Sequence, residues 1–138
     1  MRPVTEKETK IRDYRDLLAW QKARRLVKRV YEVTRGFPKE EMFGLTQQVR
    51  RAAISVPCNI AEGYGRGSRK DYVRFLQMAR GSLYEVQTQL LLAQDLGYLS
   101  DSQVAATSQE VSACAQLLYR LIESLSSKER SQQPRSQS

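Results

Sequence analysis

Residues 68–97 read SRKDYVRFLQMARGSLYEVQTQLLLAQDLG, and this stretch decides the fold. Ser68 is placed to cap the start of a helix, and Gly97 is placed to end it. Between them, apolar residues recur every three or four positions, the spacing of one helical face: Tyr72, Phe75, Leu76, Ala79, Leu83, Val86, Leu90 and Ala93. Two further apolar sets lie on the flanks of this face, namely Val73, Tyr84 and Leu91, and Met78, Leu92 and Leu96. A helix that is apolar on several sides needs several partners, so we expect an assembly of helices.

Three more helical periods accompany this one, over residues 15–35, 42–61 and 101–125, and no β-type alternation competes with them. The first has a predicted core face of Leu17, Trp20, Ala23, Val27, Val30 and Thr34, widened by Leu26 and Tyr31. Short connections between four long helices predict an all-α, antiparallel up-down-up-down four-helix bundle. We expect the bundle to span residues 14–126, with a flexible polar arm at 1–13 and a disordered tail at 127–138. The surplus apolar sets predict self-association into a cyclic homo-oligomer.

The composition excludes several classes of function. The 138 residues contain no histidine, the usual general acid–base residue and a common metal ligand. The carboxylates are scattered and the thiols have no histidine partner, so we expect no enzyme, no metal site and no cofactor. Two cysteines, Cys58 and Cys114, favour a reducing compartment over a disulfide framework. No apolar run is long enough to cross a membrane, and we expect a cytoplasmic protein without a membrane partner.

The charge is uneven along the chain. The net charge is +8 overall, but residues 1–81 carry 19 basic and 9 acidic side chains, whereas residues 82–127 carry 1 and 5. The helix over 15–35 concentrates cations in an arc of about 160° opposite its apolar face: Lys22, Arg24, Arg25, Lys28 and Arg29. We expect these residues to bind nucleic-acid phosphates together with Arg50, Arg51, Arg66, Arg69, Lys70 and Arg74. Sequence readout should be weak, because no base-reading module or aromatic stacking platform is evident. The alternatives are a basic surface that only aids solubility, and an anionic membrane or acidic protein as the partner.

Three polar residues near the flank of the helix over 42–61 form a separate candidate group: Arg51, Asn59 and Glu62. One interpretation is a site for nucleic acid or a partner protein. The other, which we favour, is an internal polar network that holds this helix against its neighbours.

Several motifs carry a resemblance to a known family. Within residues 45–65, LTQQVRRAAISVPCNIAEGYG, they are Arg50-Arg51-Ala52-Ala53, Ser55-Val56-Pro57 and Asn59-Ile60-Ala61-Glu62-Gly63. Supporting motifs are LAWQKA at 18–23, RFL at 74–76, ARGS at 79–82 with Glu85, and LGYL at 96–99. With these motifs the chain resembles the four-helix-bundle family of 23S rRNA intervening-sequence proteins, also called S23 ribosomal proteins. The resemblance covers about residues 14–126 and departs mildly at Cys58, where the family usually has serine.

The resemblance implies an antiparallel four-helix bundle that assembles into a homopentamer with a basic surface and has no defined catalytic site. Family members are encoded within insertions in rRNA genes. Related proteins are accessory variability factors beside reverse transcriptases in diversity-generating retroelements, where they bind nucleic acid and the polymerase. Our leading hypothesis is therefore a non-enzymatic RNA- or DNA-binding oligomer. The alternatives are a protein-interaction scaffold, such as a reverse-transcriptase accessory subunit, and a structural bundle without a nucleic-acid partner.

Overall fold

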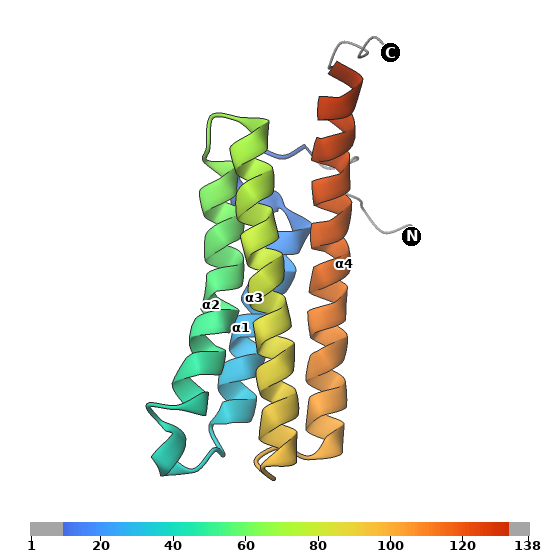
Figure 1. Cartoon of the computed structure of the whole chain (residues 1–138). Coiled ribbons are helices and arrows are strands. Elements are labelled where there is room, and N and C mark those ends of the chain that lie inside the picture. Colours follow the sequence, from blue (N-terminus) through green and yellow to red (C-terminus); the bar gives the residue numbers. More distant parts are fainter. Residues whose placement is uncertain (1–9, 133–138) are drawn as a thin grey trace, which may run out of the picture.

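Four long helices pack side by side and alternate in direction along the chain (Figure 1). The computed structural model describes residues 10–132, with side chains as far as Ser127. The helices are α1 (Leu18–Thr34), α2 (Leu45–Tyr64), α3 (Arg69–Asp95) and α4 (Asp101–Gln132). Two short 3-10 turns, η1 (Tyr14–Asp16) and η2 (Lys39–Glu41), precede α1 and α2. Each helix packs against its neighbours in the chain, and α1 packs against α4 to close the bundle. The predicted all-α four-helix bundle is confirmed.

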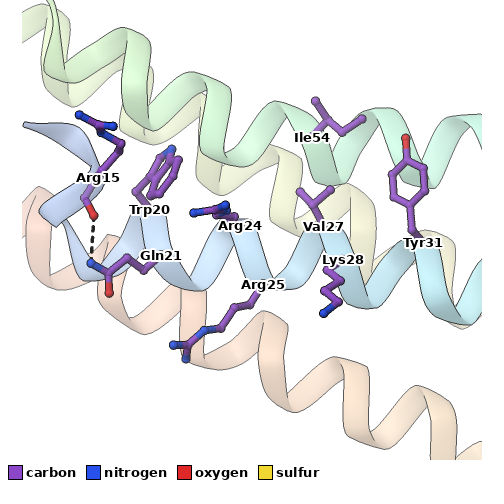
Figure 2. A pocket seen from close by; sticks show the side chains of 9 residues that line it. All are labelled: Arg15, Trp20, Gln21, Arg24, Arg25, Val27, Lys28, Tyr31 and Ile54. Carbon is purple, nitrogen blue, oxygen red and sulfur yellow. Dashed lines mark hydrogen bonds between the residues drawn. The ribbon is translucent and has the colours of Figure 1, made fainter.

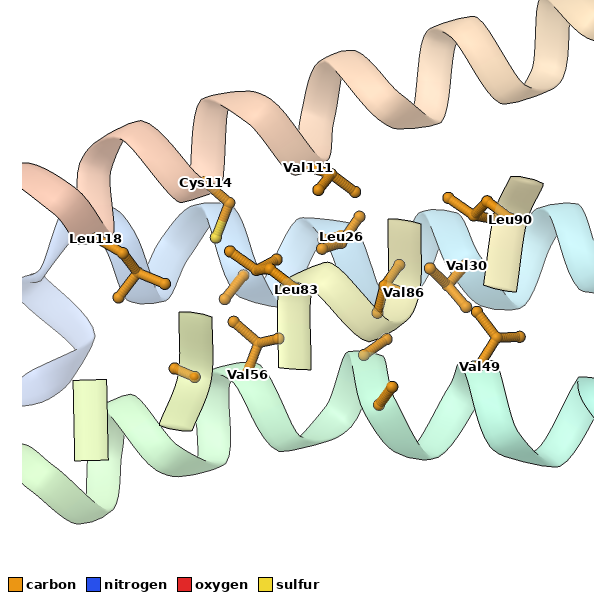
Figure 3. Packing of buried hydrophobic residues seen from close by; sticks show 14 of the residues in the cluster. Leu26, Val30, Val49, Val56, Leu83, Val86, Leu90, Val111, Cys114 and Leu118 are labelled. Carbon is orange, nitrogen blue, oxygen red and sulfur yellow. The ribbon is translucent and has the colours of Figure 1, made fainter. Parts of the chain in front are cut away.

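The core follows the predicted apolar periods on α2, α3 and α4 (Figure 3). Leucines and valines from all four helices meet along the axis, with the largest fully buried side chains including Leu26, Leu83, Leu90, Leu118, Val56 and Val86. Cys114 is fully buried, with its sulfur 3.9 Å from the carbonyl oxygen of Ala19. Burial raises the pKa of this thiol to about 12, so Cys114 behaves as a small apolar residue.

On α1 the buried face differs from the expected one. Ala19, Ala23, Leu26 and Val30 are fully buried, whereas Trp20, Val27 and Tyr31 are only half-buried. The centre of the buried face is therefore rotated toward Leu26 and away from Trp20. Both faces have helical spacing in the sequence, and the small side chains of Ala19 and Ala23 decide between them because they allow the neighbouring helices to come close.

Small residues also set the contact between α2 and α3. The hydroxyls of Ser55 and Ser82 hydrogen-bond across this interface. At Gly63, an added Cβ would lie 2.8 Å from Cβ of Phe75 and 3.2 Å from the carbonyl oxygen of Tyr72. Real Cβ atoms essentially never approach another atom to 2.8 Å, so α2 and α3 can meet here only because residue 63 has no side chain.

The two ends of α3 lie where the capping residues predict them, whereas the end of α4 differs from the predicted one. Ser68 accepts a hydrogen bond from the amide of Asp71 (3.1 Å), and Gly97, at φ +79°, follows the last turn of α3. However, α4 continues to Gln132 rather than ending near Leu125, so residues 127–132 of the predicted tail are helical. The sequence offers no strong helix breaker in this region before Pro134. The remaining tail, 133–138, lies outside the described residues.

The bundle also begins earlier than expected. Ile11 packs against the core, and Asp13 caps η1 by accepting a hydrogen bond from the amide of Arg15 (2.7 Å). The last residues of the predicted N-terminal arm therefore belong to the folded domain, and residues 1–9 of that arm lie outside the described part of the chain.

Candidate nucleic-acid interface

The cations predicted on the first helix lie on the outer surface of α1. Lys22, Arg24, Arg25 and Lys28 are exposed, and none of them has an ion-pair partner within the described residues. Arg29 differs, because its guanidinium contacts a carboxylate oxygen of Glu110 on α4 at 3.1 Å. This hydrogen bond raises the pKa of Arg29 and occupies its charge. The predicted basic face is thus formed by four of the five residues, while Arg29 links α1 to α4.

A shallow groove of about 770 Å³ runs along α1 beside α2 (Figure 2). Its lining is Arg15, Trp20, Gln21, Arg24, Arg25, Val27, Lys28, Tyr31 and Ile54, all from α1 and its preceding turn except Ile54 of α2. No acidic side chain lines it. Figure 2 shows Trp20, Val27 and Tyr31 directed toward α2. Arg25 and Lys28 are directed away from α2. The groove therefore combines an apolar floor with a basic rim.

The aromatic residues of this groove were not predicted as part of a site. Trp20 packs edge-to-face on Tyr14 with ring centroids 5.3 Å apart, and the Arg24 guanidinium lies 5.6 Å from the centre of the Trp20 ring. Tyr31 has the Arg50 guanidinium 4.4 Å above its ring. Trp20 and Tyr31 were expected in the core of the bundle, but both are half-buried and line this groove. The signal in the sequence was the spacing of residues 20, 24, 27 and 31 on one flank of the core face.

The two arginines of α2 behave differently from each other. Arg50 is half-buried, and its Nε donates a hydrogen bond to the Thr34 hydroxyl (2.9 Å), so it holds the α1–α2 contact beside Tyr31. Arg51 is exposed and lies one helical turn before Ile54, a residue of the groove. Arg51 can extend the basic rim, whereas Arg50 contacts Tyr31 of the groove and is bonded to Thr34.

The remaining predicted cations cluster at the α2–α3 connection. Arg66 pairs with Glu62 at 2.7 Å, and Arg74 lies 3.7 Å from Asp71. Both guanidinium groups also lie over the ring of Phe75, at 4.8 and 4.7 Å. Lys70 is exposed, and Arg69 is half-buried with contacts of its own. This cluster is at the end of the bundle where α1 begins (Figure 1). Among the described residues, two of its arginines are paired with carboxylates, unlike the cations that line the groove on α1.

Asn59 and Glu62, two members of the polar network predicted with Arg51, make local contacts. Asn59 donates its side-chain amide to the carbonyl of Ser55, one turn back in the same helix (2.8 Å), and Glu62 pairs with Arg66. No hydrogen bond or ion pair in the described part of the chain joins Arg51, Asn59 and Glu62 to one another. Arg51 and Glu62 are eleven residues apart, about 16 Å along a helix, and are too far apart for a direct contact.

Between residues 10 and 132, no group of three or more histidine, cysteine, aspartate or glutamate side chains could hold a metal ion. Cys58 is exposed and Cys114 is buried, and neither forms a disulfide.

None of the helices described here combines the length and apolar character that a membrane span requires.

Comparisons with known proteins agree on one family. The family of 23S rRNA-intervening sequence proteins matches residues 15–120 of the chain. Among solved structures, the chain is similar to a protein of unknown function from the S23 ribosomal protein family of Bacteroides thetaiotaomicron, with a TM-score of 0.71 and 21% sequence identity. The similarity covers 76% of this chain and 98% of that one. No curated protein matches the chain.

Proposed function

Because the chain belongs to the family of 23S rRNA-intervening sequence proteins, we propose that it is a non-enzymatic protein that binds RNA or DNA. The groove side of α1 contacts the phosphates, with little dependence on base sequence. The cluster at the α2–α3 connection adds further phosphate contacts when a longer nucleic acid follows the bundle toward that end.

The observation that carries this proposal is the row of unpaired cations on α1. Arg24 and Lys28 are one helical turn apart, and like charges at this spacing destabilise an isolated helix. The acidic side chains of the described residues leave most of these charges unmatched. A phosphate backbone would relieve the repulsion, because each phosphate places a negative charge beside a cation and releases a condensed counterion.

The salt dependence of binding tests the proposal. If about five phosphates are neutralised, the logarithm of the affinity falls with the logarithm of salt concentration with a slope of about −3.5 to −4.5. Filter binding or fluorescence anisotropy with a structured RNA and a duplex DNA would measure it. A flat response, or no binding at about 50 mM salt where such contacts are strong, would refute the proposal.

A matched pair of variants locates the interface. The double variant Arg25→Gln/Lys28→Gln removes two charges from the basic rim of the groove, and the slope should become less negative by about 1.4 to 1.8. Arg120→Gln removes one cation from the exposed side of α4, outside the groove, and should leave the slope nearly unchanged. Equal effects per charge at both places would show that only the net charge matters, and would contradict the assignment of the interface.

Exposed apolar residues on α3 favour a second function, that of a protein-interaction scaffold. Met78, Tyr84, Leu91, Leu92 and Leu96 are each about half exposed, on the two flanks of α3 that carry the surplus apolar sets. One candidate partner is a reverse transcriptase, for which the protein would be an accessory subunit. A reverse-transcriptase gene beside this one would favour that role, and an rRNA operon would favour the intervening-sequence role.

The same residues support a homo-oligomer, which we propose to be a pentamer. A ring would repeat the basic face of α1 and let several weak phosphate contacts act together. Sedimentation equilibrium should give a mass about five times the 15.9 kDa of one chain. A charge introduced by Leu92→Glu should dissociate the ring, and a monomer of the unmodified protein at micromolar concentration would exclude this assembly.

A further inference from the structure

Resting on the proposed function, we infer that the groove between α1 and α2 binds a single strand, with unpaired bases stacked on Trp20 and Tyr31. The half-exposed aromatic floor and the basic rim lie within one groove (Figure 2). This arrangement specifies the form of nucleic acid that the protein prefers.

The spacing of the lining residues suits a strand that runs along α1. Trp20 and Tyr31 are three helical turns apart, about 16 Å along the axis, and both side chains point toward α2. Arg24, Arg25 and Lys28 lie between them in the sequence and line the same groove. A strand in this position would place bases at both aromatic ends and phosphates beside the cations.

The chemistry of the lining selects unpaired bases. Val27 and Ile54 continue the apolar floor between the two aromatic rings, and Ile54 is 38% exposed although it is a large apolar side chain. In a duplex the base faces are stacked on each other and are not available to a protein, whereas a single strand can offer them. A duplex would contact the cations alone and leave the apolar floor in water.

Each of the two rings already has an arginine over it, and the two arginines differ in how firmly they are held. The Arg24 guanidinium lies 5.6 Å from the centre of the Trp20 ring, and Arg24 is exposed. An exposed cation–π contact is weaker than base–aromatic stacking, so a base can displace Arg24 and turn its charge toward a phosphate. The Arg50 guanidinium packs on the Tyr31 ring, and Arg50 is fixed by its hydrogen bond to Thr34. The Tyr31 ring is thereby pre-organised before a strand arrives.

The single tryptophan of the chain makes this inference directly measurable. We would titrate the full chain with three probes of equal phosphate content: an oligothymidylate, a duplex of mixed sequence, and an abasic strand. The oligothymidylate has about 12 nucleotides, a length within the range that single-strand sites cover. We expect the oligothymidylate to quench Trp20 fluorescence and, with one base stacked on each ring, to bind at least about 30-fold more tightly than the abasic strand. The duplex should bind without quenching.

Two variants report on Tyr31 while leaving the Trp20 signal in place. Tyr31→Leu should lower the affinity for the oligothymidylate about fivefold or more and leave the affinity for the abasic strand unchanged. Tyr119→Leu, at an aromatic residue of α4 that is 55% exposed and outside the groove, is the matched control and should change neither affinity. Circular dichroism confirms that both variants fold. If Tyr31→Leu unfolds, Trp20 quenching in the unmodified protein still decides the matter.

The outcomes separate this inference from the proposed function. If all three probes bind equally and Trp20 fluorescence is not quenched, base stacking in the groove is refuted and phosphate binding stands. If none of the probes binds, both fail.

Discussion

Replacing Gly63 by alanine should destabilise the protein, although alanine is the better helix former. In an open helix position this exchange stabilises by up to about 1 kcal/mol, because glycine loses more backbone entropy on folding. At Gly63 the new Cβ would meet three atoms of α3: Cβ of Phe75 at 2.8 Å, Cδ1 of Tyr72 at 3.1 Å and the Tyr72 carbonyl oxygen at 3.2 Å. The contact with Phe75 is about 0.7 Å shorter than a 3.5 Å carbon–carbon contact, and Phe75 Cβ can move only with its backbone.

Forcing apart a packed helix pair by this amount costs about 1–3 kcal/mol. The net effect of Gly63→Ala is therefore a loss of up to about 2 kcal/mol, after the gain in helix propensity. Gly81 is the matched control because it lies inside α3, is exposed, and would place its Cβ in open space. Gly81→Ala should stabilise by about 0.5–1 kcal/mol.

Urea unfolding followed by circular dichroism, at one protein concentration for all variants, measures the difference. The two substitutions should shift the midpoint in opposite directions, with a gap of about 1–3 kcal/mol between their unfolding free energies. In melting temperature this gap is roughly 3–10 °C for a domain of this size. If Gly63→Ala is as stable as Gly81→Ala, the close α2–α3 approach does not constrain residue 63 and the reasoning is wrong.

Four further predictions concern the environments of single side chains. In the folded protein a thiol reagent at pH 8 should modify exposed Cys58 quickly and Cys114 only after unfolding; two fast thiols would contradict the buried position of Cys114. Burial raises the pKa of Cys114 from 9.0 to about 12, so the fold favours the neutral thiol, and stability present below pH 9 should be lost at about 1.4 kcal/mol per unit as the pH rises toward 12. Cys114→Ala should remove that part of the pH dependence, and an unchanged alkaline slope would exclude the thiol as its source. Arg29→Gln should weaken nucleic-acid binding less than Arg25→Gln, because only Arg29 is paired with a carboxylate in the fold; anisotropy titrations compare them, and the reverse order would contradict the assignment. Glu62→Gln should lower the free energy of unfolding in urea by about 0.5 kcal/mol or less, since the partner of Glu62 is an exposed residue one turn away. A loss above about 2 kcal/mol would instead support the internal polar network.

The helices could be predicted because their signals are local. Apolar residues three and four apart must share a helical face, and the caps at Ser68 and Gly97 act within one turn. The arc of cations on α1 follows from the same periodicity. The expectation of no histidine-based site follows from the composition, which contains no histidine. The end of α4 was misplaced because helix-permissive polar residues continue past Leu125, and nothing local stops the helix there.

The candidate site was only partly predictable because its contacts are not local. Whether Trp20 or Leu26 faces the core depends on where α2 and α4 lie, since both residues fit a helical apolar face. Whether a cation is free depends on its partners, and Arg29 meets Glu110 across 81 residues of chain. The sequence by itself determined four amphipathic helices and a basic outer face, because periodicity and charge belong to single helices. Only the tertiary structure decided which aromatic side chains join those cations in a groove, because that depends on how closely small residues allow neighbouring helices to approach.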